Sequence, residues 1–551
     1  MAELVLGPIL RYVSETEATV WVETDVATEV EVLDARAPTF EVEGHHYALV
    51  CIEGLEPGSA TEYEVKVGGE RRWPEEDSEF PPSRIQTFDP DGVVRLGFGS
   101  CRVCLPLEEP YTLTKDADDR GREFDALDVL ASEMARGVRE NSPQILFLLG
   151  DQVYVDEGAP ETREFIRSRR SVDEPPGAEV LDFEEYTRLY RESWGEPHIR
   201  WLLSTVSTSM VWDDHDMSDD WNISRSWHDE MCEKDWWHTR VCAGFMSYWL
   251  YQHVGNLSPR ELEENDLWQA VKDGGDASRA VRDFASQAGK TGHGIRWTYC
   301  RDLGRTRVIM MDSRAARILE EDRRSMFDDE VWEWIVEHST GDFDHVVFGT
   351  TVPWLMAGAM HHLEAWDERV AAGAWGSVAE GWAEKARRAV DFDHWPCFGE
   401  SFGKLRDLIA EIGAGERAEG GAAPATITVI SGDVHHAYLA EVAYPRDRGV
   451  RSAVHQAVCS PFRNPLDSHE RNAIRAMITR PAERLGRLLA KAAGVPDAGI
   501  RWRLCEGPYF DNQVASMRID GRRMNLRLDK TVGEGPHEGR RLERVFDRAV
   551  Y

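Results

Sequence analysis

Long hydrophobic runs, an export signal and a disulfide pattern are all missing from this chain of 551 residues. No apolar stretch approaches the roughly 20 residues that cross a bilayer, so the sequence predicts no membrane span. Residues 1–5 (MAELV) open the chain without a basic segment, a long apolar core or a twin arginine, which favours a cytoplasmic location. The nine cysteines are scattered and suit a reducing compartment.

Basic residues are scarce relative to acidic ones. The chain has 64 Lys and Arg against 99 Asp and Glu, which gives a formal net charge of −35. The electrostatic field of this negative charge repels a nucleic-acid backbone unless a local basic patch reverses it, and we see no such patch. Nucleic-acid binding is therefore not expected, whereas capture of cations is favoured. No feature of the sequence predicts an oligomeric state.

Residues 1–90 show the alternation that marks half-buried strands. Val20 and Val22 alternate with Trp21 and Glu23, and the same period of two recurs at 29–32 and 63–67. A Leu-Glu-Pro-Gly turn at 55–58 followed by a tyrosine resembles the corner of an immunoglobulin-like or fibronectin-type sandwich. The sequence therefore predicts an N-terminal all-β sandwich domain over residues 1–90.

Short apolar runs alternate with helix-like segments from about residue 93 onward. Continuous apolar runs suit strands covered on both faces, and their alternation with helices predicts a layered α/β core. The predicted strands are 93–100, 145–151, 210–214, 308–312, 346–350 and 427–433.

This core is predicted to occupy residues 91–450, with insertions at 157–205 and 355–405. Residues 451–551 hold a basic helical stretch, 471–493, and a hairpin around Asp520-Gly521, and are expected to complete the same domain.

Two predicted strands lead into acidic motifs. In GDQVY (150–154) the glycine permits a sharp turn, Asp151 projects beyond the sheet, and Tyr154 can reach the same space as a phenolate, a hard ligand for ferric iron. A helix-capping role for Asp151 is the alternative. In WDDHD (212–216) three carboxylates surround one imidazole and would repel each other unless cations neutralise them. A solvated acidic loop is the alternative there.

The last apolar strand ends in GDVHH (432–436). Asp433 and His435 are two residues apart, so on extended backbone they share a face and can touch one ion. Imidazole and carboxylate suit iron, manganese or zinc. A buried histidine with an aspartate partner is the alternative.

A fourth motif, GSCRVC (99–104), contains a CxxC pair. No second CxxC exists, so a closed four-cysteine zinc site is unsupported. Cys101 at a strand end could be a thiolate ligand, and Cys104 a small buried apolar residue. Redox chemistry by the pair stays open as an alternative.

As an ordered set, GSC (99–101), GDQVY (150–154), WDDHD (212–216), DSR (312–314) and GDVHH (432–436) resemble the alkaline phosphatase D (PhoD-like) family of calcineurin-like metallophosphoesterases. The resemblance covers nearly the whole chain, because that family also carries an N-terminal β-sandwich. It implies a layered core in which a two-sheet β-sandwich is flanked by helices. The chain departs from the family at Asp216, where glutamate is usual, and at residues 393–395, which loosely match a Trp-Asp-Gly-Tyr segment.

The resemblance implies a metal centre of ferric iron with one or two calcium ions, although manganese or zinc would also suit such ligands. It also implies that His215 meets the phosphate or protonates the leaving group. The metal ligands that it implies are Cys101, Asp151, Tyr154, Asp214, Asp433 and His435.

The expected activity is hydrolysis of a small-molecule phosphoester, a monoester or a diester, by a hydroxide that the metals generate. Arg102 and Arg314 could contact phosphoryl oxygens because the guanidinium fork matches phosphate, and a structural salt bridge is the alternative for each. Trp221 could wall the cleft. A non-catalytic metal-binding scaffold with a partner-binding sandwich is the rival function, but calcium sites rarely use imidazole.

Overall fold

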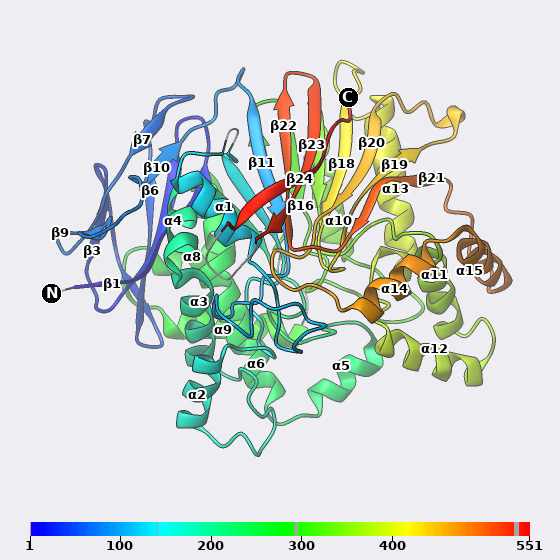
Figure 1. Ribbon diagram of the computed structural model, residues 1–551, viewed down its shortest axis with the longest axis horizontal. Helices are drawn as coiled ribbons and strands as arrows, with labels where there is room; N and C mark the ends of the chain where they lie inside the picture. Colours follow the sequence, from blue (N-terminus) through cyan, green and yellow to red (C-terminus); the bar gives the residue numbers. More distant parts are fainter. Residues whose placement is uncertain (1, 140–141, 292–295, 534–538) are drawn as a thin grey trace.

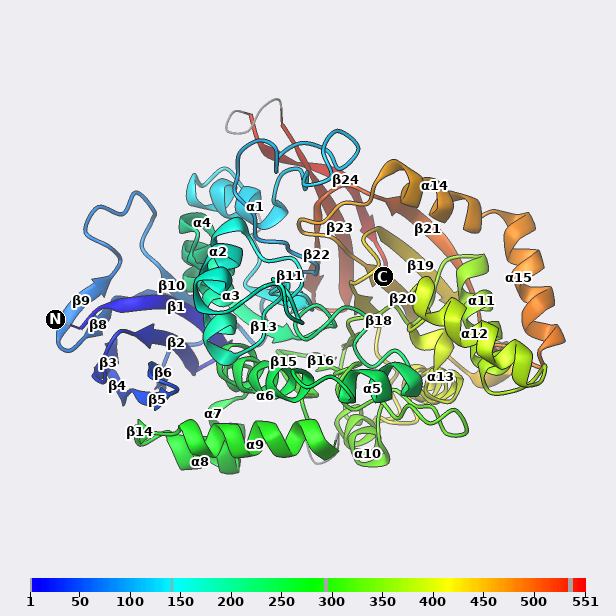
Figure 2. The same ribbon diagram turned by 90° about the horizontal axis from the view of Figure 1, so that it is seen from below.

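A computed structural model of the chain describes residues 2–139, 142–291, 296–533 and 539–551. Its N-terminal strands lie at one end, two larger sheets stand in the centre, and helices surround them (Figures 1 and 2). The predicted fold class, a layered α/β core preceded by an all-β sandwich region, is confirmed. Within the described residues, no helix is both long enough and apolar enough to cross a membrane.

The N-terminal region contains a five-stranded sheet of order β1-β2-β6-β5-β14, a four-stranded sheet of order β4-β3-β8-β9, and a pair, β10-β7. In β3, Val30 and Val32 are fully buried whereas Glu29 is exposed, as a period of two predicts. The strands are β1 (Leu4–Val13), β2 (Ala18–Thr24), β3 (Glu29–Val32), β4 (Ala35–Pro38), β5 (Phe40–Val42), β6 (His45–Ile52), β7 (Ala60–Glu62), β8 (Val65–Val67), β9 (Glu70–Trp73), β10 (Arg84–Gln86) and β14 (Gly275–Asp276).

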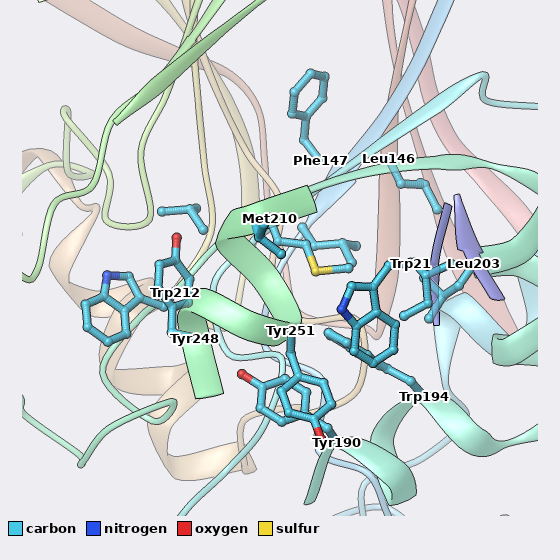
Figure 3. Close-up of a cluster of buried hydrophobic side chains, with 14 of the residues drawn as sticks. Trp21, Leu146, Phe147, Tyr190, Trp194, Leu203, Met210, Trp212, Tyr248 and Tyr251 are labelled. Carbon is cyan, nitrogen blue, oxygen red and sulfur yellow. The ribbon is translucent and has the colours of Figure 1, made fainter. Parts of the chain in front are cut away.

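Strand β2 differs from the predicted half-buried pattern, because all seven of its residues are buried. Its second face lies against the π-helix η1 (Tyr248–His253), where Trp21 packs with its ring centroid 5.3 Å from that of Tyr251 (Figure 3). The buried Arg11 of β1 donates to the carbonyl oxygens of Tyr251, at 2.7 Å, and Gln252. The N-terminal sheet and the central region therefore share one hydrophobic core.

His45 joins the same interface through two ion pairs. Its Nδ1 lies 3.0 Å from Glu23 Oε1, and its Nε2 lies 2.8 Å from Glu184 Oε2 on α3 (Phe183–Gly195). Burial lowers the pKa of His45, but the hydrogen bonds to Glu23 and Glu184 more than offset this, and the pKa is raised above 6.5.

The raised pKa of His45 predicts a pH-dependent contribution to stability. A pKa that is higher in the folded state stabilises the fold below about pH 6.5 and loses this effect as pH rises through the folded value. We expect His45→Gln to lower the free energy of unfolding by about 1 kcal/mol more at pH 6 than at pH 9. Urea denaturation measures it, with His46→Gln as the neighbouring control. An equal loss for His45→Gln at both pH values would contradict the prediction.

Two central sheets form the core. The first has the order β13-β12-β11-β22-β23-β24, and the second has the order β15-β16-β17-β18-β20-β19-β21. Strands β11, β12 and β13 run parallel, as do β16, β17, β18 and β20. Their bounds are β11 (Val94–Gly99), β12 (Ile145–Leu149), β13 (Ser207–Val211), β15 (Tyr299–Leu303), β16 (Thr306–Met310), β17 (His345–Gly349), β18 (Thr426–Ser431), β19 (Ala437–Ala443), β20 (Ala453–Val458), β21 (Arg501–Tyr509), β22 (Gln513–Asp520), β23 (Arg523–Val532) and β24 (Arg541–Ala549).

The helices lie in the connections between these strands. Asp125 caps α1 by accepting from two backbone amides, and Asp182 caps α3 in the same way through one amide. The remaining bounds are α1 (Ala126–Ala135), α2 (Pro160–Arg169), α4 (Pro197–Thr205), α5 (Arg225–Cys232), α6 (Trp237–Ser247), η2 (Val254–Asn256), α7 (Pro259–Glu263), α8 (Asp266–Val271), α9 (Ser278–Thr291), α10 (Asp329–His338), α11 (Ala359–Ala371), α12 (Ser377–Ala389), η3 (Trp395–Cys397), α13 (Gly399–Ala414), η4 (Arg446–Arg448), α14 (Ser468–Met477) and α15 (Arg480–Ala492).

Candidate metal centre

Five strands of the two sheets, namely β11, β12, β13, β16 and β18, end close to one another, and a polar segment follows each of them. Contacts between the two sheets bring these segments together. Trp212 donates from Nε1 to Asp312 Oδ1 at 3.2 Å, and the backbone amide of Asp433 donates to Ser100 Oγ at 2.9 Å. Ligand sites of α/β sheets form at such carboxyl ends.

The backbone is left-handed at four of the predicted ligands. Cys101, Asp151, Asp433 and His435 have φ between 50° and 67°, and they are four of the ten described non-glycine residues with positive φ. That conformation is strained for residues with a Cβ and concentrates at functional sites. Three of these strands, β11, β12 and β18, therefore end in a sharp turn that carries a predicted ligand.

Asp151, Tyr154 and Cys101 form one side of the centre. The Tyr154 hydroxyl donates to Asp151 Oδ2 at 3.1 Å and accepts from Asn464 Nδ2 at 3.3 Å. Asp151 Oδ1 is buried and forms no hydrogen bond. Cys101 Sγ lies 3.0 Å from Ser100 Oγ. Burial, together with the neighbouring carboxylates, raises the pKa of Cys101, Asp151 and Tyr154. All three would ionise more readily beside a cation.

Asp213 and Asp214 extend this centre toward the second sheet. Asp213 Oδ2 and Asp214 Oδ1 are buried and form no hydrogen bond. Burial raises the pKa of Asp213, and the charges of Asp433 and Asp214 raise it further. Ligand atoms approach within 4.8 Å of one another in three groups, Asp151–Asp214–His215, Asp213–Asp214–Asp433 and Asp156–His215–Asp219.

His215 is oriented by a carboxylate that sequence reasoning missed. Its Nδ1 lies 2.9 Å from Asp156 Oδ2, and its ring centroid lies 4.4 Å from that of Tyr154. Burial lowers the pKa of His215, but Asp156 and the other nearby carboxylates more than offset this and raise it well above 6.5. The remaining nitrogen, Nε2, is 3.7 Å from Asp219 Oδ1. The spacing of Asp156, five residues after Asp151, is the only signal that could have found it.

His435 differs from His215 in its protonation. Burial lowers the pKa of His435 to about 3, and the positive charge of His215 adds to that effect. The imidazole is therefore neutral at physiological pH, which is the form that binds metals.

Asp216 binds the backbone of the loops that carry Asp151 and Asp213 instead of lining the centre. Its carboxylate accepts from the backbone amides of Asp151 at 3.1 Å, Asp213 at 2.9 Å and Val153 at 3.2 Å, and from Gln252 Nε2 at 3.2 Å. Burial raises the pKa of Asp216 to about 7 despite these bonds. One of the three carboxylates of the WDDHD motif thus holds the backbone that carries the other two.

Arg314 is a buried cation that contacts several carboxylates of this centre. Its guanidinium donates to Asp213 and Asp393, and Nη2 lies 3.1 Å from Asp433 Oδ1 and 3.4 Å from Asp214 Oδ1. The side chain is almost wholly buried, and the surrounding carboxylates raise its pKa against the lowering effect of burial. The guanidinium is thus fully paired with carboxylates.

His394 and Glu364 complete the far side and were not predicted. His394 Nε2 lies 3.1 Å from Asp433 Oδ2, and its Nδ1 lies 3.1 Å from Glu364 Oε1 on α11. Glu364 is fully buried, and both residues belong to the 355–405 segment. The sequence signals for that segment were its many Glu, His and Trp residues and, for His394, the loose match of residues 393–395 to a Trp-Asp-Gly-Tyr segment.

The structure does not bring Arg102 or Trp221 into this cluster. Arg102 donates to Asp125, at 2.6 Å, and to Glu196 and the Ser193 carbonyl, so all three nitrogens have structural partners. Trp221 packs in the core with its ring centroid 4.5 Å from that of Trp212. The structural alternative therefore fits Arg102 better than a contact with phosphate, and a packing role fits Trp221.

The residues present fit a metal centre. Three buried carboxylate oxygens, on Asp151, Asp213 and Asp214, form no hydrogen bond, which is costly unless a cation completes their environment. Carboxylates, a thiol, a phenol and neutral imidazole form a ligand set that suits transition metals together with a hard cation such as calcium.

The chain was compared with known proteins. A family model described as "PhoD-like phosphatase" matches residues 130–488, and one described as "Domain of unknown function (DUF7800)" matches residues 1–85. The search of curated proteins found no match. A solved structure described as "Structure of PhoD" is similar with a TM-score of 0.58 and 12% identity, covering 99% of this chain and 92% of that one. A maltogenic amylase from S. marinus has a TM-score of only 0.15 at 9% identity, covering 98% of this chain and 80% of that one. This score is too low to indicate a shared fold.

The PhoD structure shares the fold, and the family model spans more than half of the chain and includes the residues from Asp151 to His435. The chain therefore belongs to the PhoD-like phosphatase family.

Proposed function

We propose that this chain is a metal-dependent phosphoester hydrolase whose metals lie among the strand-end residues. The observation that carries the proposal is the position of Asp214, whose ligand atom lies within 4.8 Å of Asp151 in one group and of Asp213 and Asp433 in another. Two cations that share a carboxylate lie close enough to act on one phosphoryl group.

The ligand roles follow from the contacts. Cys101, Asp151 and Tyr154 would hold one metal, for which ferric iron is the proposed identity because thiolate and phenolate both suit it. Asp214, whose Oδ1 forms no hydrogen bond, would hold a calcium ion together with Asp433, and His435 would complete the centre as a neutral imidazole. Metals in such a centre lower the pKa of a bound water and so supply the nucleophile near neutral pH.

His215 would act on the substrate itself. Its Nδ1 faces Asp156, which keeps the ring in one orientation and favours its protonated form. The other nitrogen can then donate a proton to a phosphoryl oxygen or to the leaving group. Arg314 was predicted to bind substrate. Because Asp213, Asp393 and Asp433 already bind its guanidinium, we propose instead that it balances their charge.

A panel of aryl phosphate monoesters and diesters, assayed with iron and calcium, tests the proposal. We expect turnover of at least one ester that chelation abolishes and metal restores. Bound metal without turnover on any ester would favour the rival function, a metal-binding scaffold.

The two cysteines of the CxxC motif distinguish hydrolysis from redox chemistry. Cys104 Sγ lies 3.2 Å from the Glu192 carbonyl oxygen, and all nine cysteines are free thiols. We expect Cys101→Ser to lower iron content and kcat/KM by about 100-fold, since a ligand is lost, and Cys104→Ser to leave both within about twofold. Metal analysis and ester hydrolysis measure the two effects. A redox role predicts equal damage from both substitutions.

A prediction for His394 follows from its two contacts. If it orients Asp433 as a ligand, His394→Ala should weaken metal retention by about 10–100-fold, whereas His394→Gln should restore part of it. Chelator competition measures this effect independently of activity. The control is His361→Gln, because His361 is buried on α11, the helix that carries Glu364, but packs against Trp502. Equal metal retention in His394→Ala and in the unmodified chain would contradict the prediction.

The finer features of this function are proposals as well. We propose a small-molecule substrate, a cytoplasmic location and no binding of nucleic acid, in keeping with the charge of −35. We also propose the domain division 1–90, 91–450 and 451–551. In support, β22, β23 and β24 extend the first central sheet and β21 extends the second.

A further inference from the structure

We propose that helix α15 is a docking surface for an anionic phospholipid membrane. The surface consists of the outward side chains Arg480, Arg484, Leu485, Leu488 and Lys491. None of them belongs to the metal centre, so the inference does not depend on the proposed hydrolysis.

Two leucines on this helix are exposed to an unusual degree. Leu485 and Leu488 have 60% and 65% of their surface accessible, and they are three residues apart, so they lie side by side on one face. Exposed apolar side chains that gather in one place mark an interaction surface. Three further exposed large side chains, Trp375, Val378 and Trp382, lie on the neighbouring α12 and the turn before it.

A basic stripe runs beside the leucines. Arg480, Arg484, Arg487 and Lys491 are spaced by four, three and four residues, which places them along one face of the helix. Glu483 is the only acidic residue of α15, and it pairs with Arg487 at 2.7 Å. Arg480, Arg484 and Lys491 are exposed, and no ion pair is found for them among the described residues.

Helix α15 is held in place by close packing against α11. Its inner face carries Gly486, where an added Cβ would lie 3.1 Å from the Ala359 carbonyl oxygen and 3.2 Å from His362 Cβ, so α15 and α11 pack closely. Figures 1 and 2 both place α15 at the end of the molecule opposite the N-terminal strands. A rigid helix at an extremity can meet a flat surface without steric obstruction.

The basic residues of α15 indicate that its partner is an anionic membrane. A chain with a net charge of −35 is repelled by an anionic surface, except where basic residues reverse the field within about one Debye length of 8–10 Å. The sequence alone predicted no such patch, whereas the structure aligns four basic residues along one face of α15. Basic side chains beside exposed leucines are the pattern of helices that lie in the membrane interface. The leucines would enter the acyl boundary while the basic groups contact lipid phosphates.

Vesicle sedimentation of the full chain tests the proposal. We expect binding to phosphatidylcholine vesicles that contain phosphatidylglycerol, little binding to pure phosphatidylcholine, and weakening by salt. Arg480→Gln, Arg484→Gln and Lys491→Gln together should weaken binding about 100-fold, at about fivefold per charge. Leu485→Ser with Leu488→Ser should weaken it at least about tenfold.

The matched control replaces basic and apolar residues elsewhere on the surface, Arg260→Gln and Arg279→Gln with Val26→Ser, and should bind as the unmodified chain does. Melting temperature and hydrolysis of a soluble ester should stay unchanged in every variant. Equal binding to both kinds of vesicle, or unchanged binding after the leucine substitutions, would overturn the proposal. Binding to polyglutamate without binding to vesicles would also overturn it and would indicate an acidic protein partner.

Discussion

Asp151→Asn is expected to reduce kcat/KM by about 10³-fold, or about 4 kcal/mol in the activation free energy. An amide in place of the carboxylate removes a negative charge that would bind the metal, while the shape of the side chain is kept. The metal content of the purified protein should fall in parallel. Steady-state hydrolysis and elemental analysis measure the two effects.

The same substitution should stabilise the metal-free fold. Burial raises the pKa of Asp151 far above its usual value, so the ionised form costs free energy at neutral and higher pH. The cost is present above the unfolded pKa and disappears as pH falls below it. Asp151→Asn should therefore melt at a higher temperature than the unmodified chain in the presence of a chelator at pH 8.

Asp216→Asn is the matched control for Asp151→Asn. Asp216 is equally buried, but its oxygens accept from backbone amides of the same loops. An amide cannot accept at both positions, so this variant should lose stability, by about 1–3 kcal/mol, with a smaller effect on metal content than Asp151→Asn. If Asp151→Asn kept its metal and most of its activity, the proposed role of Asp151 as a metal ligand would be wrong.

Arg314→Met should lower the free energy of unfolding of the metal-free chain by about 3–5 kcal/mol. The substitution removes the guanidinium that pairs with Asp213, Asp393 and Asp433. Arg317 and His394 still pair with Asp393 and Asp433, but the buried Asp213 loses its counter-charge. Urea denaturation measures the loss. Added calcium should restore part of it, because a divalent cation can replace the missing charge.

Two further variants test how the charge and shape of Arg314 stabilise the fold. Arg314→Lys keeps the charge but not the planar fork, so it should recover only part of the stability. Arg225→Met removes an exposed arginine that pairs with Asp229 and should cost about 0.5 kcal/mol. A loss for Arg314→Met as small as that for Arg225→Met would show that the carboxylates are protonated in the folded state.

The strand-end residues were predictable because each follows a continuous apolar run. The runs 145–151 and 427–433 became β12 and β18, and the turns after them carry Asp151 and Asp433. The two strands lie in different central sheets, and the contacts between those sheets bring residues together that lie hundreds of positions apart. A periodic pattern and a family resemblance were sufficient for this part of the site.

The remaining contacts depend on tertiary packing that no local pattern encodes. Glu364 and His394 lie in a helical segment whose composition gives no register against the sheets. Arg102 follows a predicted ligand directly, yet its partners Asp125 and Glu196 lie on other segments, and they determine where its side chain goes. The two-sided burial of β2 was likewise unpredictable, because the period of two describes one face and is silent on what covers the other.

The contacts of Arg11 make the central region depend on the N-terminal sandwich. Arg11 binds the Gln252 carbonyl, and the Gln252 side chain donates to Asp216, the residue that holds the Asp151 loop. Three successive contacts therefore connect the first strand of the chain to the proposed metal ligands. The N-terminal sandwich therefore supports the loops of the centre through direct contacts. Both regions should melt in a single cooperative calorimetric transition. A transplanted sandwich would support the centre only if it brought an equivalent arginine.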